Sequence, residues 1–163
     1  MRIYCWDASA LIKRYFIETG SDTVDAIFAQ ISILEMITTP WGYTETFSIL
    51  VRRLNEKILN QSSFSTASTA LQSEVVYNSD FRFLPVSDKD IFASIATIYK
   101  HSLNATDSAI LTTILEYQKS SGNECVLISC DKRLIRSAEL EGLKVINPQI
   151  LSPDNVADIL INL

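Results

Sequence analysis

The sequence predicts an α/β fold of three layers: a central, mostly parallel β-sheet flanked by α-helices. Short, strongly apolar segments such as residues 2–6 and 125–129 are typical of strands buried on both faces. They alternate with longer segments whose apolar residues recur at helical spacing, which favours a parallel sheet covered by helices. No linker, repeat or low-complexity tract interrupts the 163 residues, so we expect a single domain over 1–163.

The first third of the chain predicts strands that are each followed by a helix. The apolar run 2–6 stops at Asp7, after which residues 8–17 are expected to be helical. A Thr-Gly-Ser break at 19–21 precedes a helix that Ser21 can cap. The next elements are a helix around 22–34 with the stripe Val24, Ile27, Phe28 and Ile31, a strand near 36–39 that stops at Pro40, and a helix from about Tyr43 with the stripe Phe47, Leu50, Val51, Leu54 and Ile58.

The rest of the chain continues this alternation. Residues 61–77, rich in Ser, Thr and Ala, predict a helix, and 81–86 a strand. Ser87 and Asp90 form a Ser-x-x-Asp helix start. The remaining elements are a helix that carries Ile91, Ile95 and Ile98, a helix over 106–120, a strand over 125–129, a helix from Asp131 to Gly142, a strand over 143–146 and a helix that begins at Ser152-Pro153.

Two acidic residues follow predicted strands. Asp7 comes directly after residues 2–6, and Asp131 comes after the run 125–129. In a parallel sheet the ligand crevice lies beyond the carboxyl ends of the strands, so we expect both carboxylates at the crevice. Each also has a structural alternative, as the N-cap of the helix that follows it.

Two further acids stand near predicted helix starts. Glu45 precedes Phe47 by two residues, and Asp107 shares an apolar stripe with Ile110, Leu111 and Ile114. A carboxylate on an apolar stripe is costly unless it is paired or binds a metal. The alternative is a helix-start acid that satisfies free N–H groups and the helix dipole.

Four carboxylates on one side of a sheet would repel one another in the absence of cations. Oxygen ligands favour Mg²⁺ or Mn²⁺ over Zn²⁺. The one histidine, His101, cannot by itself support a Ser/His/Asp triad or a multi-histidine metal site. Sites with one or two such ions catalyse in-line phosphoryl displacement, so the acids predict metal-dependent chemistry of this kind.

The acids stand within four motifs that resemble those of the PIN-domain family, especially its VapC-type toxins. The matching segments are Asp7-Ala8-Ser9-Ala10-Leu11-Ile12-Lys13-Arg14-Tyr15 with Glu18-Thr19-Gly20-Ser21, Tyr43-Thr44-Glu45 with Arg52-Arg53, Ala105-Thr106-Asp107-Ser108-Ala109-Ile110-Leu111, and Ser129-Cys130-Asp131-Lys132-Arg133-Leu134 with Val145-Ile146-Asn147-Pro148. One such motif is weak evidence, whereas the full set, in order over residues 2–148, is fairly specific.

The resemblance implies a PIN fold and a Mg²⁺- or Mn²⁺-dependent endoribonuclease, commonly neutralised by a cognate antitoxin. In VapC-like proteins the wide apolar stripes line dimer or antitoxin grooves, so a homodimer is also expected. The residues implied as both metal ligands and catalytic groups are Asp7, Glu45, Asp107 and Asp131. Ser9 matches a hydroxyl position near the family's site, with helix capping as the alternative.

Several residues beside the acids are candidates to contact RNA. The basic residues that could meet RNA phosphates or an acidic antitoxin, or simply form a solvated helix face, are Lys13, Arg14, Arg52 and Arg53. Trp41 and Tyr43 could stack on an unpaired base or pack beneath their loop. The chain departs from its relatives at residues 101–104, His-Ser-Leu-Asn, where relatives often carry Arg after the Leu.

Three other functions fit parts of the pattern. A catalytically silent PIN module would bind RNA or protein, but here all four acids are present. A PIN nuclease of RNA processing would share the site without an antitoxin. A phosphatase of the haloacid dehalogenase type would need a second Asp two residues after the first, where this chain has Ser9.

The composition constrains the partner and the compartment. With 14 Lys+Arg against 19 Asp+Glu, the net charge of −5 excludes a protein that holds nucleic acid by global charge alone. Setting aside the four proposed ligands leaves 15 acids against 14 bases, so we expect RNA binding to be weak until metal is bound. No apolar run approaches the roughly 18 residues of a membrane span, and MRIYCWDAS is not a signal peptide. We expect a cytoplasmic protein whose three cysteines are reduced.

Overall fold

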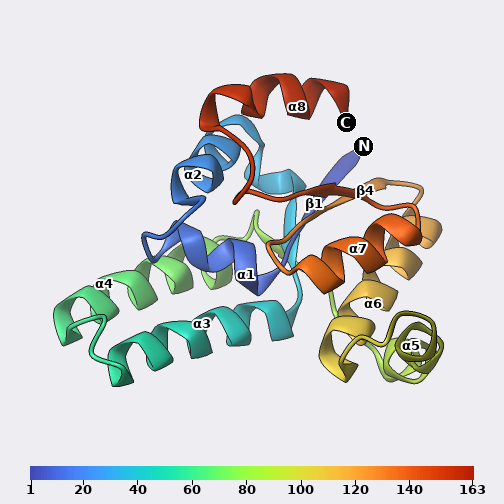
Figure 1. Ribbon diagram of the computed structural model, residues 1–163, viewed down its shortest axis with the longest axis horizontal. Helices are drawn as coiled ribbons and strands as arrows, with labels where there is room; N and C mark the ends of the chain where they lie inside the picture. Colours follow the sequence, from blue (N-terminus) through green and yellow to red (C-terminus); the bar gives the residue numbers. More distant parts are fainter.

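The computed structural model describes all 163 residues and has a five-stranded, all-parallel sheet at its centre (Figure 1). The strands are β1 (Arg2–Trp6), β2 (Met36–Thr38), β3 (Arg82–Phe83), β4 (Glu124–Ile128) and β5 (Lys144–Ile146), and their order across the sheet is β3-β2-β1-β4-β5. The order reverses between β1 and β4, which are hydrogen-bonded neighbours, so this pair is the topological switch point. The predicted α/β fold is confirmed.

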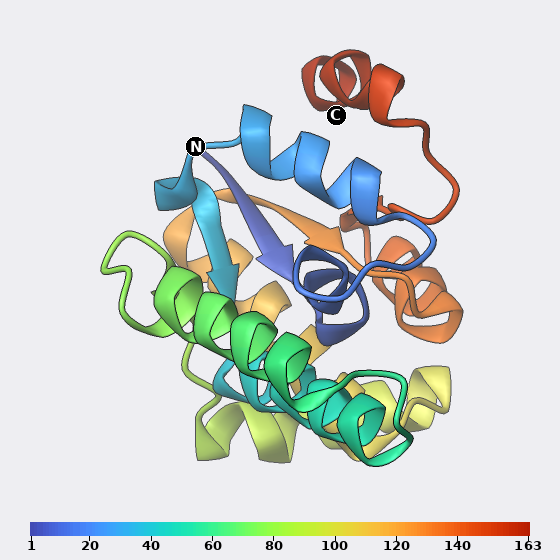
Figure 2. The ribbon, with the colours of Figure 1, turned by 90° about the vertical axis from the view of Figure 1, so that its left-hand side faces the viewer.

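Helices connect the strands and cover both faces of the sheet (Figures 1 and 2). They are α1 (Ala8–Leu11), α2 (Ser21–Gln30), α3 (Pro40–Asn55), α4 (Gln61–Leu71), α5 (Asp88–His101), α6 (Ala105–Ser121), α7 (Lys132–Leu140) and α8 (Val156–Asn162). On one side α8 packs on α2, and α3 packs on α1 and α4. On the other side α6 contacts β4, α5 and α7. The arrangement has three layers, with the sheet as the middle one.

The strands divide their side chains between two hydrophobic cores. Tyr4 and Trp6 of β1 join the core under α2, whereas Ile3 and Cys5 join the core under α6. This alternation is the period of two expected of a strand. Both faces of β1 are therefore buried, which explains why its sequence is almost continuously apolar.

Several elements have other ends than the sequence predicts. The helix expected around 22–34 ends as α2 at Gln30, and the strand expected over 81–86 is limited to β3, Arg82–Phe83. The helix expected over 8–17 ends as α1 at Leu11 and continues only as a 3₁₀ turn over Ile12–Arg14. The helix α3 begins at Pro40, three residues earlier than predicted. Thr39 caps it by accepting a hydrogen bond from the Gly42 N–H, and proline fits the first helical position because that position needs no N–H donor.

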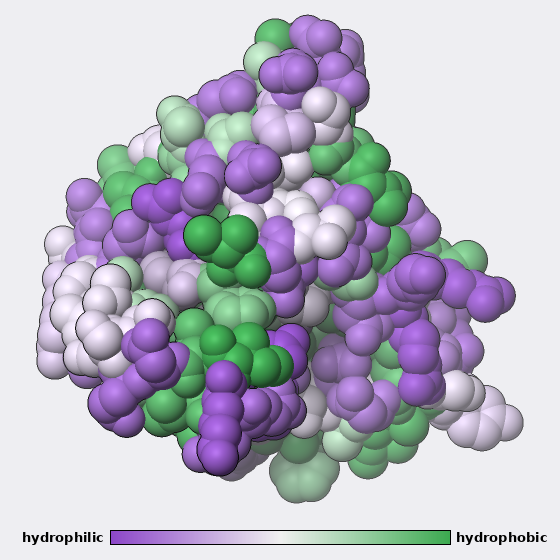
Figure 3. Space-filling model, turned by 60° about the vertical axis from the view of Figure 1, so that its left-hand side comes forward, coloured by the Kyte–Doolittle hydropathy of each residue, from purple (hydrophilic) through white to green (hydrophobic).

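The apolar stripes of α3 and α5 are buried less than their spacing predicts. Phe47 is 38 % exposed, Ile95 is 63 % exposed, and Ile58 lies beyond the end of α3. The pair of helices α3 and α4 projects past the sheet, so its outer turns have no core beneath them (Figure 1). The face turned forward in Figure 3 accordingly shows patches of hydrophobic residues among hydrophilic ones.

Two expectations drawn from composition can be compared with the structure. Cys5 and Cys125 are buried, Cys130 is half-buried, and all three thiols are free. None of the helices combines the length and the apolar composition that crossing a membrane requires.

The core under α6 provides a test of the fold. Leu111 is fully buried there, whereas Leu140 on α7 is 64 % exposed. We expect Leu111→Ala to lower the free energy of unfolding by about 2–5 kcal/mol, because it leaves a cavity. Leu140→Ala, the control, should change it by less than about 0.5 kcal/mol. Urea denaturation measures both, and equal effects would contradict the packing described here.

Candidate active site at the carboxyl edge of the sheet

The four acids lie at the carboxyl edge of the sheet, around the switch point. Asp7 follows β1, and Asp131 follows the neighbouring strand β4. Glu45 lies in the second turn of α3, and Asp107 lies in the first turn of α6. The last two face each other across a hollow of about 490 Å³, lined by Trp41, Thr44, Glu45, Ser48, Asn104, Ala105, Thr106 and Asp107. This hollow is called the acid cleft below.

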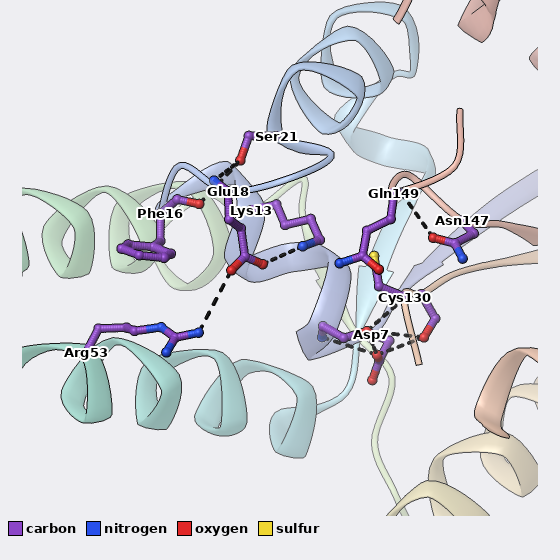
Figure 4. Close-up of polar contacts among 11 residues, drawn as sticks. Asp7, Lys13, Phe16, Glu18, Ser21, Arg53, Cys130, Asn147 and Gln149 are labelled. Carbon is purple, nitrogen blue, oxygen red and sulfur yellow. Dashed lines mark hydrogen bonds and ion pairs between the residues drawn. The ribbon is translucent and has the colours of Figure 1, made fainter. Parts of the chain in front are cut away.

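Asp7 is the buried member of the group. Its Oδ2 atom accepts hydrogen bonds from the hydroxyls of Ser9, at 2.5 Å, and Ser129, at 3.0 Å, and from the Ser9 N–H at 3.2 Å (Figure 4). These bonds cap α1 and leave Oδ1 without a hydroxyl partner. Burial raises the pKa of Asp7, and the bonds from the two serines oppose that rise. Asp7 therefore caps a helix with one carboxylate oxygen and keeps the other without a hydroxyl partner.

Ser129 is a site residue that the sequence analysis did not single out. It is fully buried, donates its hydroxyl hydrogen to Asp7 and accepts the Asp131 N–H at 3.1 Å. Ser9 makes a parallel link, because its Oγ accepts the Cys130 N–H at 2.8 Å while bonding to Asp7. The two hydroxyls thus tie the end of β1 to the loop after β4. The signal for Ser129 was its position just after an apolar strand and two residues before an acid.

Asp131 is the N-cap of α7, which is the structural alternative predicted for it. Its Oδ1 atom accepts the backbone N–H groups of Arg133, at 2.8 Å, and Leu134, at 2.9 Å, at the start of α7. The other carboxylate oxygen makes no such bond. Capping and a place in the acid group are therefore compatible for Asp131, as they are for Asp7.

Two hydrogen bonds with Asn104 hold Asp107 in the first turn of α6. The Asn104 Nδ2 group donates to Asp107 Oδ2 at 2.7 Å, and Asn104 Oδ1 accepts the Asp107 N–H at 2.8 Å. Partial burial, then repulsion by Asp7, Asp131 and Glu45, raises the pKa of Asp107 to about 6. The carboxylates therefore act on one another electrostatically.

Glu45 shows the same effect in a weaker form. Partial burial and then the charge of Asp7 raise the pKa of the Glu45 carboxyl, and the nearby Arg52 opposes the rise. Glu45 itself is exposed at the edge of the acid cleft. It is therefore free to turn toward a ligand.

The donor atoms fit a hard divalent cation in their chemistry. They are carboxylate and hydroxyl oxygens, and burial raises the pKa of the neighbouring Cys130 thiol to about 11, which keeps it protonated and a poor metal ligand. No three of the carboxylates stand close enough together to form a ready-made metal cage. Coordination of Mg²⁺ or Mn²⁺ would thus draw side chains such as Glu45 and Asp107 inward.

Two of the four basic candidates are neutralised around one carboxylate. Lys13 is buried and forms an ion pair with Glu18, and Arg53 lies 3.9 Å from the same residue (Figure 4). Arg53 also pairs with Glu56 at 3.2 Å. Because Lys13 is buried and paired, its expected contact with RNA or an antitoxin finds no support in the geometry.

The other two basic candidates differ from each other. Arg14 pairs with Asp25 at 2.7 Å and with Glu74 at 3.1 Å. Arg52 makes no ion pair and bonds only to the Ser48 hydroxyl, at 3.1 Å, beside the acid cleft. Of the four, Arg52 is the one placed to meet a phosphate.

The two aromatic candidates also differ in their surroundings. Trp41 lines the acid cleft, where its ring can meet a ligand. Tyr43 packs edge-on against Phe83, with ring centroids 6.0 Å apart. Trp41 also packs against the core under α6, so both alternatives remain predictions for it, whereas the packing alternative describes Tyr43.

A family model matches most of this region. The model of the PIN domain matches residues 44–149, a span that contains Glu45, Asp107 and Asp131. Asp7 lies before the matched span. No curated protein matches the chain.

Solved structures resemble the chain over most of its length. PAE2754 from Pyrobaculum aerophilum has a TM-score of 0.59 at 18 % identity, covering 98 % of this chain and 93 % of that one. VapC20 of Mycobacterium tuberculosis, described as a toxin that cleaves the sarcin-ricin loop, has a TM-score of 0.61 at 12 % identity, covering 82 % and 94 %. The FitAcB structure from Neisseria gonorrhoeae has a TM-score of 0.56 at 16 % identity, covering 91 % and 100 %. At these identities the likeness concerns the fold.

The raised pKa of Asp107 predicts how the stability of the metal-free protein depends on pH. The folded-state pKa of about 6 exceeds the ordinary value near 4, so the folded protein binds the proton more tightly than the unfolded chain does. Stability is therefore highest below pH ~4 for this group and falls as the pH rises toward 6.

Asp107→Asn should remove this loss. We expect its melting temperature in EDTA at neutral pH to exceed that of the wild type by a few degrees, on the order of 1 kcal/mol. Asp80→Asn, which changes an exposed carboxyl, is the control. Thermal melts from pH 4 to 8 measure the difference, and the same small change in both variants would refute repulsion at the site.

Proposed function

Because the chain belongs to the PIN-domain family, we propose that it is a Mg²⁺- or Mn²⁺-dependent endoribonuclease that hydrolyses RNA phosphodiester bonds. The observation that carries the proposal is the gathering of Asp7, Glu45, Asp107 and Asp131 at the switch point of the sheet, where burial and then the charges of neighbouring acids raise the pKa of Glu45 and of Asp107. Four carboxylates held against their mutual repulsion indicate a site built for cations.

The four acids would hold the metal through their unbonded oxygens. The available atoms include Oδ1 of Asp7 and Oδ2 of Asp131, because the partner oxygens are used in capping. When bound, the ion supplies a more acidic water and stabilises the leaving oxygen of the phosphodiester. The proposal treats all four acids as both metal ligands and catalytic groups.

The surrounding residues would orient these acids and the substrate. Ser9 and Ser129 fix the Asp7 carboxylate, and Asn104 fixes Asp107. The acid cleft is open to solvent between α3 and α6, so a single RNA strand could enter it. Trp41 offers a base-stacking surface there, and Arg52 offers a positive charge near Glu45.

We further propose that the chain is the toxin of a type II toxin–antitoxin pair. The support is the resemblance of its fold to VapC20, a toxin, and to FitAB, which has been solved bound to a DNA fragment. The partners would be a cognate antitoxin and a second copy of the chain. An RNA substrate and three free thiols are consistent with a cytoplasmic protein.

The other candidates are a PIN nuclease of RNA processing and a catalytically silent PIN module. The processing enzyme would share the site but lack an antitoxin gene beside its own, and a small upstream reading frame that encodes a DNA-binding protein would count against it. The silent module would bind no metal. The intact set of four acids favours an active enzyme over that module.

Changing Asp7 tests the proposed reaction directly. Asp7→Asn removes a buried charge and keeps a similar shape, so we expect the fold to persist while RNA cleavage in Mg²⁺ falls by at least about 100-fold. Cleavage of labelled single-stranded RNA measures the rate, and circular dichroism checks the fold. Asp80→Asn should cleave as the wild type does.

Two results would contradict the proposed reaction. The first is an Asp7→Asn protein that cleaves RNA at the wild-type rate. The second is a wild-type protein that shows neither Mn²⁺ binding by calorimetry nor loss of cleavage in EDTA, and this result would favour the silent module.

The serine that bonds to Asp7 should affect catalysis through that residue. Ser129→Ala leaves Asp7 Oδ2 with one hydroxyl donor fewer, so we expect activity or metal affinity to fall about 10- to 100-fold. Ser94→Ala is the matched control, because Ser94 is also buried but bonds only to its own helix, at the Ile91 carbonyl. Titration of cleavage with Mg²⁺ separates the two effects. Equal losses in both variants would show that Ser129 is only structural.

A further inference from the structure

We propose that a basic hollow beside the acid cleft binds a backbone phosphate of the RNA strand, an inference that rests on the proposed ribonuclease function. The hollow lies between the end of α5 and one face of α7 and measures about 300 Å³. The residues that define it are Lys100, His101, Ser102, Arg133, Arg136, Ser137 and Leu140. It is called the basic hollow below.

The free positive charge of the chain is concentrated at this place. Seven of the 14 Lys and Arg residues make no ion pair, and three of those seven are Lys132, Arg133 and Arg136, within the first five residues of α7. The net charge of the whole chain is −5, so these three residues give the start of α7 a local positive charge of opposite sign. Two of the three, Arg133 and Arg136, line the basic hollow.

One acid, Glu141, pairs with residues of the basic hollow, but it forms no ion pair with Arg133 or Arg136. Glu141 accepts hydrogen bonds from Lys100 Nζ at 2.8 Å and bonds to His101 Nε2 at 2.6 Å. Those bonds hold the end of α5 against the end of α7. Arg133 bonds to the Ser102 carbonyl, which fixes its side chain, and Arg136 has neither a hydrogen bond nor an ion pair. Fixed and free guanidinium groups side by side suit a phosphate, which they can bind through two oxygens.

The basic hollow and the acid cleft have no lining residue in common, but residues 102–104 connect them. Asp131 caps α7, the helix that carries both arginines, and Ser102 stands two residues before Asn104, which holds Asp107. A strand whose reacting phosphate lies at the acids could therefore pass over residues 102–104 and place a neighbouring phosphate in the basic hollow.

RNA binding by matched charge variants tests this proposal. In an Asp7→Asn background, which keeps the RNA intact, Arg136→Gln should weaken binding of a fluorescein-labelled single-stranded oligouridine about threefold at low salt. The slope of log K against log salt should also fall by about 0.7, the value for one phosphate contact on a single strand. Lys119→Gln is the control, because Lys119 is exposed, unpaired and at the far end of α6 from Asp107.

A kinetic measurement complements the binding data. With Asp7 intact, Arg136→Gln should raise KM for the same oligouridine and leave kcat within about a factor of two, because the residue touches the strand and not the reacting atoms. Lys119→Gln should change neither constant.

The outcomes distinguish failure of the phosphate-site proposal from failure of the ribonuclease proposal. Equal weakening by Arg136→Gln and Lys119→Gln, or no weakening by either, would overturn the basic hollow as a phosphate site. Weakened binding of an acidic partner protein with unchanged RNA binding would also overturn it. If the wild type cleaves no RNA but Arg136→Gln alone weakens oligouridine binding, the nuclease proposal fails and the phosphate site stands.

Discussion

Repulsion among four carboxylates at the carboxyl edge of one parallel sheet is the constraint on which the site depends. The adjacent parallel strands β1 and β4 end side by side, so the residues that follow them, Asp7 and Asp131, meet at the switch point. The starts of α3 and α6 then bring Glu45 and Asp107 to the same edge. Asp7 and Asp131 cannot move apart while the sheet stays intact, whereas the exposed side chain of Glu45 can turn. Partial burial, and then this repulsion, raise the pKa of Glu45 and of Asp107.

The fold holds the acids in place with neutral donors. Hydroxyls from Ser9 and Ser129, an amide from Asn104 and the N–H groups at the start of α7 all bond to the carboxylates. Neutral donors orient a carboxylate without cancelling its charge. Lys13, by contrast, pairs with Glu18, and Arg52, which lies near Glu45, forms no ion pair with any acid of the site. The site therefore keeps its negative charge, which the proposed binding of a metal ion requires.

The sequence predicted the strands, their parallel arrangement and the acids, because each depends on local pattern. A buried parallel strand needs a continuous apolar run, and an acid just after such a run falls at the carboxyl edge whatever the rest of the chain does. The burial of Lys13 and the exposure of Ile95 escaped prediction because both depend on which surfaces meet in three dimensions. Ser129 escaped for a related reason, since its importance comes from a bond to Asp7 across 122 residues of sequence.

The net charge of −5 describes this protein poorly because opposite charges are separated along one surface. The acids gather at the ends of β1 and β4, and free arginines stand one helix turn further on, in α7. An RNA strand that met only the acids would add its own negative charge to theirs, and this repulsion would oppose binding before a cation arrived. A strand held also at Arg133 and Arg136 gains an attraction that does not need the metal. Under the proposed function, the cation would neutralise the reacting phosphate, and the two arginines would bind the neighbouring phosphate of the same strand.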